Sequence, residues 1–82
     1  MKSIDFHGYT IEEALLQAEK DIYQAYCSEE SIIIWITGIG PINKQLLEFV
    51  RKNALVVAVL NDGPLGLTYN GKIAVEIYRE DL

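Results

Sequence analysis

The sequence holds very few of the residues that metal centres and disulfide-bonded folds require. Its 82 residues include one cysteine, Cys27, and one histidine, His7. A lone cysteine closes no disulfide within the chain, and no second Cys or His is present to complete a zinc set. We therefore interpret Cys27 as a small filler at the end of a helix rather than as a nucleophile. Proton transfer near neutral pH falls to His7, because histidine is the side-chain type that changes charge in that range.

The sequence also lacks the signals of membrane insertion and export. No apolar run is long enough to span a bilayer, and the amino terminus has neither the basic segment nor the apolar stretch of a signal peptide. We therefore expect no membrane partner and a cytoplasmic location. Half of the residues are nevertheless apolar, and a chain of 82 residues is too short to divide its core. One folded domain over residues 1–82 is expected.

Positive charge is scarce, since seven Lys and Arg stand against twelve Asp and Glu and give a net charge of −5. Such a charge repels a phosphate backbone unless the cations gather on one surface, so nucleic-acid binding should be local and salt-sensitive. Lys44 and Arg51 are seven residues apart on a predicted helix and share a face that suits such contacts. Glu48 lies between them, and the same residues fit an ordinary solvated helix face.

Apolar periodicity predicts the order β-α-β-α-β-β. Strands are expected at residues 2–7, 31–36, 54–60 and 72–78, and helices at about residues 11–26 and 41–52. Thr10 and Glu13 predict a capping box at the first helix, and Asn53 is expected to end the second helix in the left-handed conformation. Asn70-Gly71 predicts a tight hairpin turn, and a short extra strand before it is left open. These elements build a two-layer α/β sandwich with a four-stranded mixed sheet.

The first chemical motif is Ile4-Asp5-Phe6-His7-Gly8. Alternation along a strand places Asp5 and His7 on the same side, and Gly8 lets the backbone turn before the helix. Asp5 is therefore able to orient the imidazole of His7 or to help bind a divalent ion, although one carboxylate is a poor metal site. The alternative is a surface pair whose only task is to cap a loop.

The second motif, Thr37-Gly38-Ile39-Gly40, follows an apolar run typical of the centre of a sheet and precedes a helix that starts at Pro41. Its glycines let the backbone approach a phosphate, and the helix points its N–H groups at the same spot. The motif lacks the Gly-Lys-Ser/Thr ending of a nucleotide P-loop, and Lys44 comes too late to supply it. A strand-to-helix turn that needs glycine only for its conformation gives the same pattern.

The two motifs meet if the first two strands are parallel. Both strands then end at one edge of the sheet, which is where ligands bind in α/β folds. His7, Gly8 and residues 37–40 would form one site. Tyr9, beside the first motif, is the tyrosine that we expect to be exposed and able to stack on a base.

Together the motifs resemble those of the Smr family, the small MutS-related domains. Ile4-Asp5-Phe6-His7-Gly8 is similar to the Leu-Asp-x-His-Gly opening of that family, and Thr37-Gly38-Ile39-Gly40 occupies the place of its Thr/His-Gly-x-Gly signature. The resemblance implies a fold similar to the carboxy-terminal domain of translation initiation factor 3. It also implies DNA or RNA binding and, in many members, endonuclease activity.

Carried over by position, the resemblance implies that Asp5 and His7 are catalytic. The phosphate-binding residues would be Gly8, Thr37, Gly38, Gly40 and Lys44. Two positions depart from the family pattern, because Ile39 stands where Lys or Arg is common and Pro41 replaces a small polar residue. Both changes weaken the expected grip on phosphate.

Two hypotheses follow. In the first, the chain binds and cleaves nucleic acid; RNA would supply its own 2′-hydroxyl, whereas DNA nicking would need activated water and Mg²⁺ or Mn²⁺. In the second, the domain keeps the fold without catalysis and acts as a weak binding module or contacts a protein partner. Ile39, Pro41 and the acidic balance of the chain motivate the second hypothesis.

Overall fold

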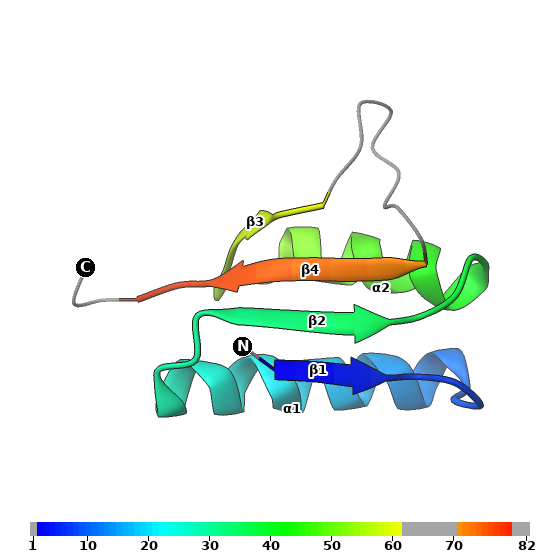
Figure 1. Cartoon of the computed structure of the whole chain (residues 1–82), viewed down its shortest axis with the longest axis horizontal. Coiled ribbons are helices and arrows are strands. Elements are labelled where there is room, and N and C mark those ends of the chain that lie inside the picture. The colour runs from blue at the N-terminus through cyan, green and yellow to red at the C-terminus, as the bar shows by residue number, and fades with distance from the viewer. Residues whose placement is uncertain (1, 62–70, 80–82) are drawn as a thin grey trace.

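The computed structural model describes residues 2–61 and 71–79 and has helices on one face of a single sheet (Figure 1). Its elements in chain order are β1 (Lys2–Asp5), α1 (Ile11–Ser28), β2 (Ile32–Ile36), α2 (Pro41–Lys52), β3 (Val56–Val59) and β4 (Lys72–Ile77). The order β-α-β-α-β-β and the two-layer architecture are as predicted. The possible extra strand and Asn70 lie outside the described residues. The likeness to the carboxy-terminal domain of translation initiation factor 3 stays a prediction.

The sheet is mixed, with strand order β1-β2-β4-β3. β1 pairs with β2 in parallel, whereas β4 is antiparallel to both β2 and β3. β2 and β4 are therefore the central strands, as the unbroken apolar run of β2 predicted. β3 is an edge strand with an irregular register between Val56 and Ala58, and the intervening Val57 is 58% exposed. Val57 therefore has no paired residue on β4.

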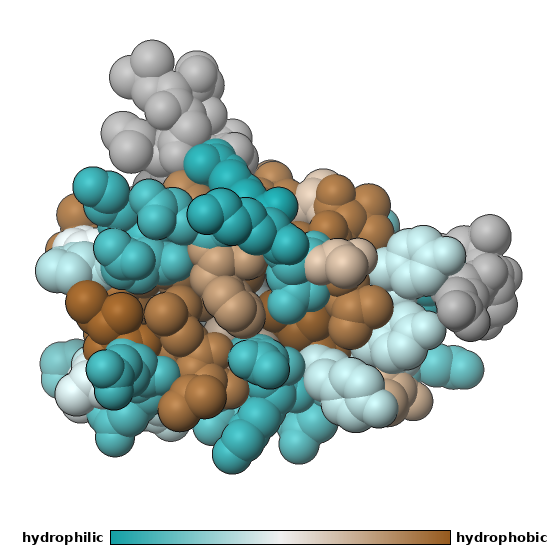
Figure 2. Space-filling model, turned by 180° about the vertical axis from the view of Figure 1, so that it is seen from behind, coloured by the Kyte–Doolittle hydropathy of each residue, from teal (hydrophilic) through white to brown (hydrophobic). Residues whose placement is uncertain are grey.

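The core lies between the helices and one face of the sheet. On β2 and β4 every second residue is buried, which is the period of a strand covered on one side. Seen from the helix side, apolar side chains form a band between the two helices (Figure 2). The buried apolar residues are Phe6, Ala14, Ala18, Ile22, Ala25, Ile33, Trp35, Leu46, Leu47, Val50, Ile73, Val75 and Ile77. The opposite face of the sheet has no helix over it (Figure 1).

Among the described residues, one charged side chain is buried in this core. Asp21 is only 1% exposed, and its Oδ2 accepts a hydrogen bond of 3.0 Å from the indole Nε1 of Trp35. Its Oδ1 accepts one of 2.9 Å from the amide of Gln17 and lies 3.6 Å from Nζ of Lys2. A buried carboxylate persists only when its oxygens are paired in this way. The network therefore ties α1 to both β1 and β2.

The helix ends differ from the prediction in one respect. The capping box of Thr10 and Glu13 is present at the start of α1. Asn53 was expected to be left-handed but is extended (φ −81°, ψ 127°), and its side-chain oxygen accepts from the N–H of Leu55. The chain passes directly from α2 towards β3, so an extended residue is needed there. The left-handed residue is Glu29, at the end of α1 (φ 65°).

Cys27 lies at the end of α1 as predicted, but it is exposed and is not a core filler. Arg79, beyond β4, donates from its guanidinium to the carbonyl oxygens of Ala25, Tyr26 and Glu30, where α1 ends. Within residues 2–61 and 71–79, neither helix is long and apolar enough to cross a membrane.

Candidate functional site

The parallel pairing of β1 and β2 brings the two motifs together. Asp5, the last residue of β1, pairs with Ile36, the last residue of β2, so both chains leave the sheet at the same edge. A hollow of about 210 Å³ opens there, lined by Asp5, His7, Ile36, Thr37 and Gly38. This hollow, called the His7 hollow below, joins residues of both motifs, as the argument from parallel strands predicted, although His7 and Thr37 are 30 positions apart in the sequence.

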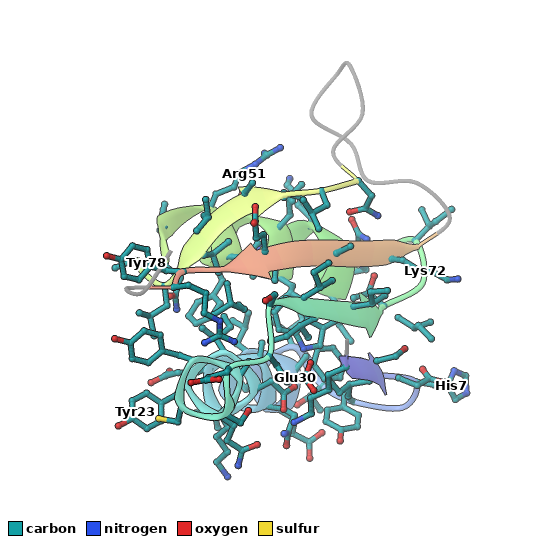
Figure 3. All side chains as sticks on the ribbon, turned by 60° about the vertical axis from the view of Figure 1, so that its left-hand side comes forward. His7, Tyr23, Glu30, Arg51, Lys72 and Tyr78 are labelled. Atoms are coloured by element: carbon teal, nitrogen blue, oxygen red, sulfur yellow. The ribbon has the colours of Figure 1, made fainter. Side chains whose placement is uncertain are left out.

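His7 lies at the tip of this edge and points away from the body of the domain (Figure 3). It is exposed, and within the described residues its imidazole has no hydrogen-bond partner. The carboxylate of Asp5 accepts instead from the backbone N–H of His7, at 2.9 Å. Asp5 thus fixes the turn that carries His7, which is the loop-capping role, and does not hold the imidazole itself.

The turn after β1 also depends on Gly8 and Phe6. Gly8 has a φ of +84°, a conformation that residues with a side chain rarely adopt. The N–H of Tyr9 donates to the carbonyl of Phe6 at 3.0 Å, and their rings lie 5.0 Å apart in a tilted arrangement. Tyr9 is 36% exposed, so it is accessible as predicted, and the ring of Phe6 covers part of it. The expectation that Tyr9 alone is exposed is wrong, because Tyr23 and Tyr78 are more exposed, at 63% and 44%.

Gly71, just before β4, forms hydrogen bonds with the glycine loop of the second motif. The carbonyl oxygen of Gly71 accepts from the N–H groups of Thr37 and Gly38, at 2.7 and 2.9 Å. The hydroxyl of Thr37 lies 3.0 Å from the same oxygen and accepts from the side-chain amide of Asn43, at 2.9 Å. A Cβ on Gly71 would approach backbone atoms of Gly38 to 2.7 Å. The first two N–H groups of the motif are therefore satisfied internally and do not face a ligand.

The remainder of the predicted phosphate site lies on the other side of this loop. Gly40 is the N-cap of α2 and supplies no side-chain hydrogen bond, so the helix start keeps the uncapped N–H groups that favour anions. Gly40 and Lys44 line a second hollow of about 560 Å³ together with Arg51. Lys44 and Arg51 thus share a face as predicted, but they do not line the His7 hollow. Ile39 lines the second hollow and is 92% exposed.

Sequence reasoning missed Gly71 and Lys72. Asn70-Gly71 gave a turn signal, but nothing local indicates that Gly71 packs on residues 37–38. Lys72 opens β4, and its Cα pairs with that of Ile36. His7 and Lys72 project at the same end of the sheet in Figure 3. The tight turn before an alternating strand was the available signal for Lys72, because it sets which residues of β4 share a face of the sheet.

The residues at the hollow do not form a dedicated metal site. In the part of the chain that the structure describes, no three His, Cys, Asp or Glu side chains cluster as metal ligands. The hollow offers one carboxylate, Asp5, and one of its oxygens is already bonded to the backbone of His7. Mg²⁺ and Mn²⁺ prefer several oxygen ligands, so this donor set alone does not suit either ion.

No protein-family model and no curated protein matches this chain. Among solved structures, the crystal structure of the Smr domain of Thermus thermophilus MutS2 matches it with a TM-score of 0.82 and 22% sequence identity. The match covers 96% of this chain and 100% of that one. The chain therefore has the fold of an Smr domain, and the predicted resemblance is confirmed for the fold.

Proposed function

We propose that this chain is a nucleic-acid-binding domain that cleaves RNA, with His7 as the residue that moves the proton. The observation that supports the proposal is the His7 hollow, which the chain's one histidine lines together with Thr37 and Gly38 of the glycine motif. The Smr fold is compatible with this activity. A shared fold alone carries no function, so the proposal depends on the residues of the site.

The chemistry needs one proton acceptor and a nucleophile that is already in place. The 2′-oxygen of a nucleotide attacks the adjacent phosphorus, and its proton passes to an imidazole nitrogen of His7. The bond from phosphorus to the next 5′-oxygen then breaks, and that oxygen takes up a proton from water, while the imidazolium of His7 gives its proton to the hydroxide that remains. The products are a 2′,3′-cyclic phosphate and a 5′-hydroxyl. His7 suits this role because its imidazole is exposed and is engaged with no other described residue.

RNA is favoured over DNA because its 2′-hydroxyl lies within the substrate. DNA nicking would need a water molecule activated from outside, usually by a divalent ion. Asp5 is the one carboxylate in the hollow, and it is committed to the turn. We therefore derive no step through Mg²⁺ or Mn²⁺.

The second hollow would hold a neighbouring phosphate of the same strand. It combines the uncapped start of α2 with two cationic side chains, Lys44 and Arg51, and one carboxylate, Glu48. The helix start and the excess of one cation favour an anion. A strand that crosses Ile39 would then place one phosphate at His7 and another at α2. Thr37 and Gly38 would shape the hollow rather than donate to phosphate, since Gly71 already accepts from them.

A binding module without catalysis is the second candidate. The carboxylate of Asp5 bonds the backbone and leaves the imidazole of His7 without an orienting partner among the described residues. Ile39 offers no charge between the glycines, and the chain carries a net charge of −5. Each feature lowers the expected rate or affinity. In this case the domain binds RNA or a protein partner without cleaving it.

A cleavage assay with matched variants separates the two candidates. Purified protein, His7→Ala and Asp5→Asn are incubated with labelled single-stranded RNA, stem-loop RNA and supercoiled DNA at low salt, with Mg²⁺, Mn²⁺ or EDTA. We expect RNA cleavage in EDTA that falls by about 10²-fold or more in His7→Ala. Asp5→Asn keeps an oxygen that accepts from the His7 N–H, so its loss should be much smaller.

An RNA with one 2′-deoxynucleotide at the cleaved position tests the nucleophile directly. Loss of cleavage at that position alone supports attack by the 2′-hydroxyl. If the deoxy substrate is cleaved as fast as RNA, the proposed chemistry is wrong. If wild-type protein binds RNA but cleaves no substrate under any of these conditions, the binding module is the correct description.

A further inference from the structure

The face of the sheet that no helix covers carries apolar side chains at its centre and charged side chains towards its two ends. Paired residues share a face, and Ile33 and Trp35 of β2 point into the core. The uncovered face therefore carries the alternate residues Ser3, Asp5, Ile32, Ile34, Ile36, Lys72, Ala74 and Glu76. Its centre is an apolar column of three half-buried isoleucines on β2. This column is partly open to solvent in the described part of the chain and leads to the His7 hollow, which Ile36 lines.

The row of residues nearest the hollow runs across three strands. Asp5 pairs with Ile36, and Ile36 pairs with Lys72. Asp5 and Ile36 also line the hollow, so the hollow and the uncovered face are one continuous surface. Two strand spacings, about 10 Å, separate the backbones of Asp5 and Lys72. A lysine side chain is long enough to reach a phosphate bound between them.

Lys72 is the cation that this surface presents. It is exposed, and no ion pair engages its Nζ within residues 2–61 and 71–79. Its backbone is fixed, because the side chain of Asn61 donates to the carbonyl of Lys72 at 2.7 Å and accepts from the N–H of Ala74 at 2.9 Å. Glu76 lies at the opposite end of the face, paired with Ile32. Beside the hollow the face thus carries Lys72 and the carboxylate of Asp5, one oxygen of which accepts from a backbone N–H, and the acidic Glu76 lies away from the hollow.

We infer that the uncovered face is the binding surface for unpaired nucleotides next to the cleaved phosphate, with Lys72 as the phosphate contact that Ile39 does not supply. The inference rests on the proposed function and adds the substrate class, single-stranded RNA. A base lies flat on Ile34 and Ile36, and the adjoining phosphate meets Lys72. Unpaired bases expose the faces that this packing needs, whereas bases in a duplex are already stacked.

Fluorescence anisotropy with a labelled single-stranded oligouridylate tests the inference. The full chain is compared with Lys72→Gln and Ile34→Thr over a series of salt concentrations. Lys20→Gln is the charge-matched control, since Lys20 is exposed on α1 in the other layer. Leu16→Gln, 63% exposed on the same helix, is the apolar control. Circular dichroism melts check folding, and Lys72→Gln alters only an exposed side chain and should fold.

We expect Lys72→Gln to weaken binding about 3- to 10-fold at low salt and to reduce the log–log salt slope by about 0.7, the value for one phosphate contact on a single strand. Ile34→Thr should weaken binding about fourfold. The two control variants should bind like wild type, and a duplex of the same length should bind more weakly than the single strand.

The outcomes separate this inference from the function on which it rests. If RNA is cleaved and His7→Ala abolishes the cleavage, but Lys72→Gln and Ile34→Thr bind like wild type, the surface is wrong and the function stands. Equal losses in Lys72→Gln and Lys20→Gln likewise refute a specific contact. If Ile34→Thr changes the sedimentation of the protein but not RNA binding, the face is a protein interface. If wild-type protein neither binds nor cleaves RNA, both proposals fail.

Discussion

The buried pair of Asp21 and Trp35 gives the sharpest test of how this fold is held together. Asp21 is 1% exposed and Trp35 is fully buried, and the bond between them joins α1 to the centre of the sheet. Asp21→Ala leaves the indole N–H of Trp35 buried with no acceptor and also removes the bond from Gln17. An unsatisfied buried donor costs about 1–3 kcal/mol, so with the lost bond the expected destabilisation is about 2–4 kcal/mol.

That loss is large for so small a domain. A chain of 82 residues is expected to have a free energy of unfolding on the order of 4–12 kcal/mol. Asp21→Ala should therefore lower Tm by roughly 10 °C or more. Asp21→Asn should cost less, about 1 kcal/mol, because its oxygen still accepts from Trp35 and the amide of Gln17 can turn to accept from it. The contact of Asp21 with Lys2 matters less, since the lysine side chain is 38% exposed.

A double-mutant cycle measures the bond itself. Asp21→Ala, Trp35→Phe and the double variant are unfolded in urea and followed by far-UV circular dichroism, because Trp35 is the chain's one tryptophan and its fluorescence is lost. The single variants should couple by about 1.5–3 kcal/mol, since removing both partners leaves no unpaired group. Additivity within about 0.5 kcal/mol would show that the buried bond contributes nothing and would refute the reasoning.

Two further predictions concern the glycine loop and the end of α1. Gly71→Ala should lower the free energy of unfolding by more than about 2 kcal/mol and reduce cleavage, because φ is +62° and the new Cβ would meet Gly38 at 2.7 Å. Gly8→Ala has φ +84° but open space around it, so it should cost only about 1 kcal/mol in urea unfolding. Equal costs for the two variants would contradict this account. Arg79→Met should lower the free energy of unfolding by about 1.5–3 kcal/mol through its lost bonds to Ala25 and other carbonyls of α1, whereas an unchanged urea midpoint would show that these bonds add nothing.

The convergence of the two motifs was predictable, and the reason is topological. A strand followed by a helix and then a neighbouring strand returns in parallel, so Asp5 and Ile36 had to end at one edge once both segments were strands. The capping box at Thr10 and the start of α2 at Pro41 were equally local signals. What these signals fix is the position of the backbone. They do not fix which partner each side chain takes.

Sequence reasoning was incomplete where a side chain had a choice of partners. For Asp5 it left three roles open, namely orienting the imidazole, helping to bind an ion and capping a loop, and the structure has the third, since the backbone N–H of His7 is only two residues away. Asp21 carried a visible signal, because it lies three residues after Ala18 and four before Ala25 on the buried stripe. Its partner, Trp35, comes from another element and was not deducible. Gly71 is the same case, because its packing on the loop is a tertiary contact.

The packing of the fold does not explain why residue 39 is an isoleucine. At 92% exposure it adds nothing to the core, and a charged or polar residue would be better solvated there. Covering an aliphatic side chain of this size contributes about 1.5–3 kcal/mol, which becomes available only when something binds over the loop. In the proposed complex that partner is the nucleotide between the two hollows. The phosphate contact that a cation at position 39 would make then passes to Lys72 on the sheet side and to Lys44 on the helix side.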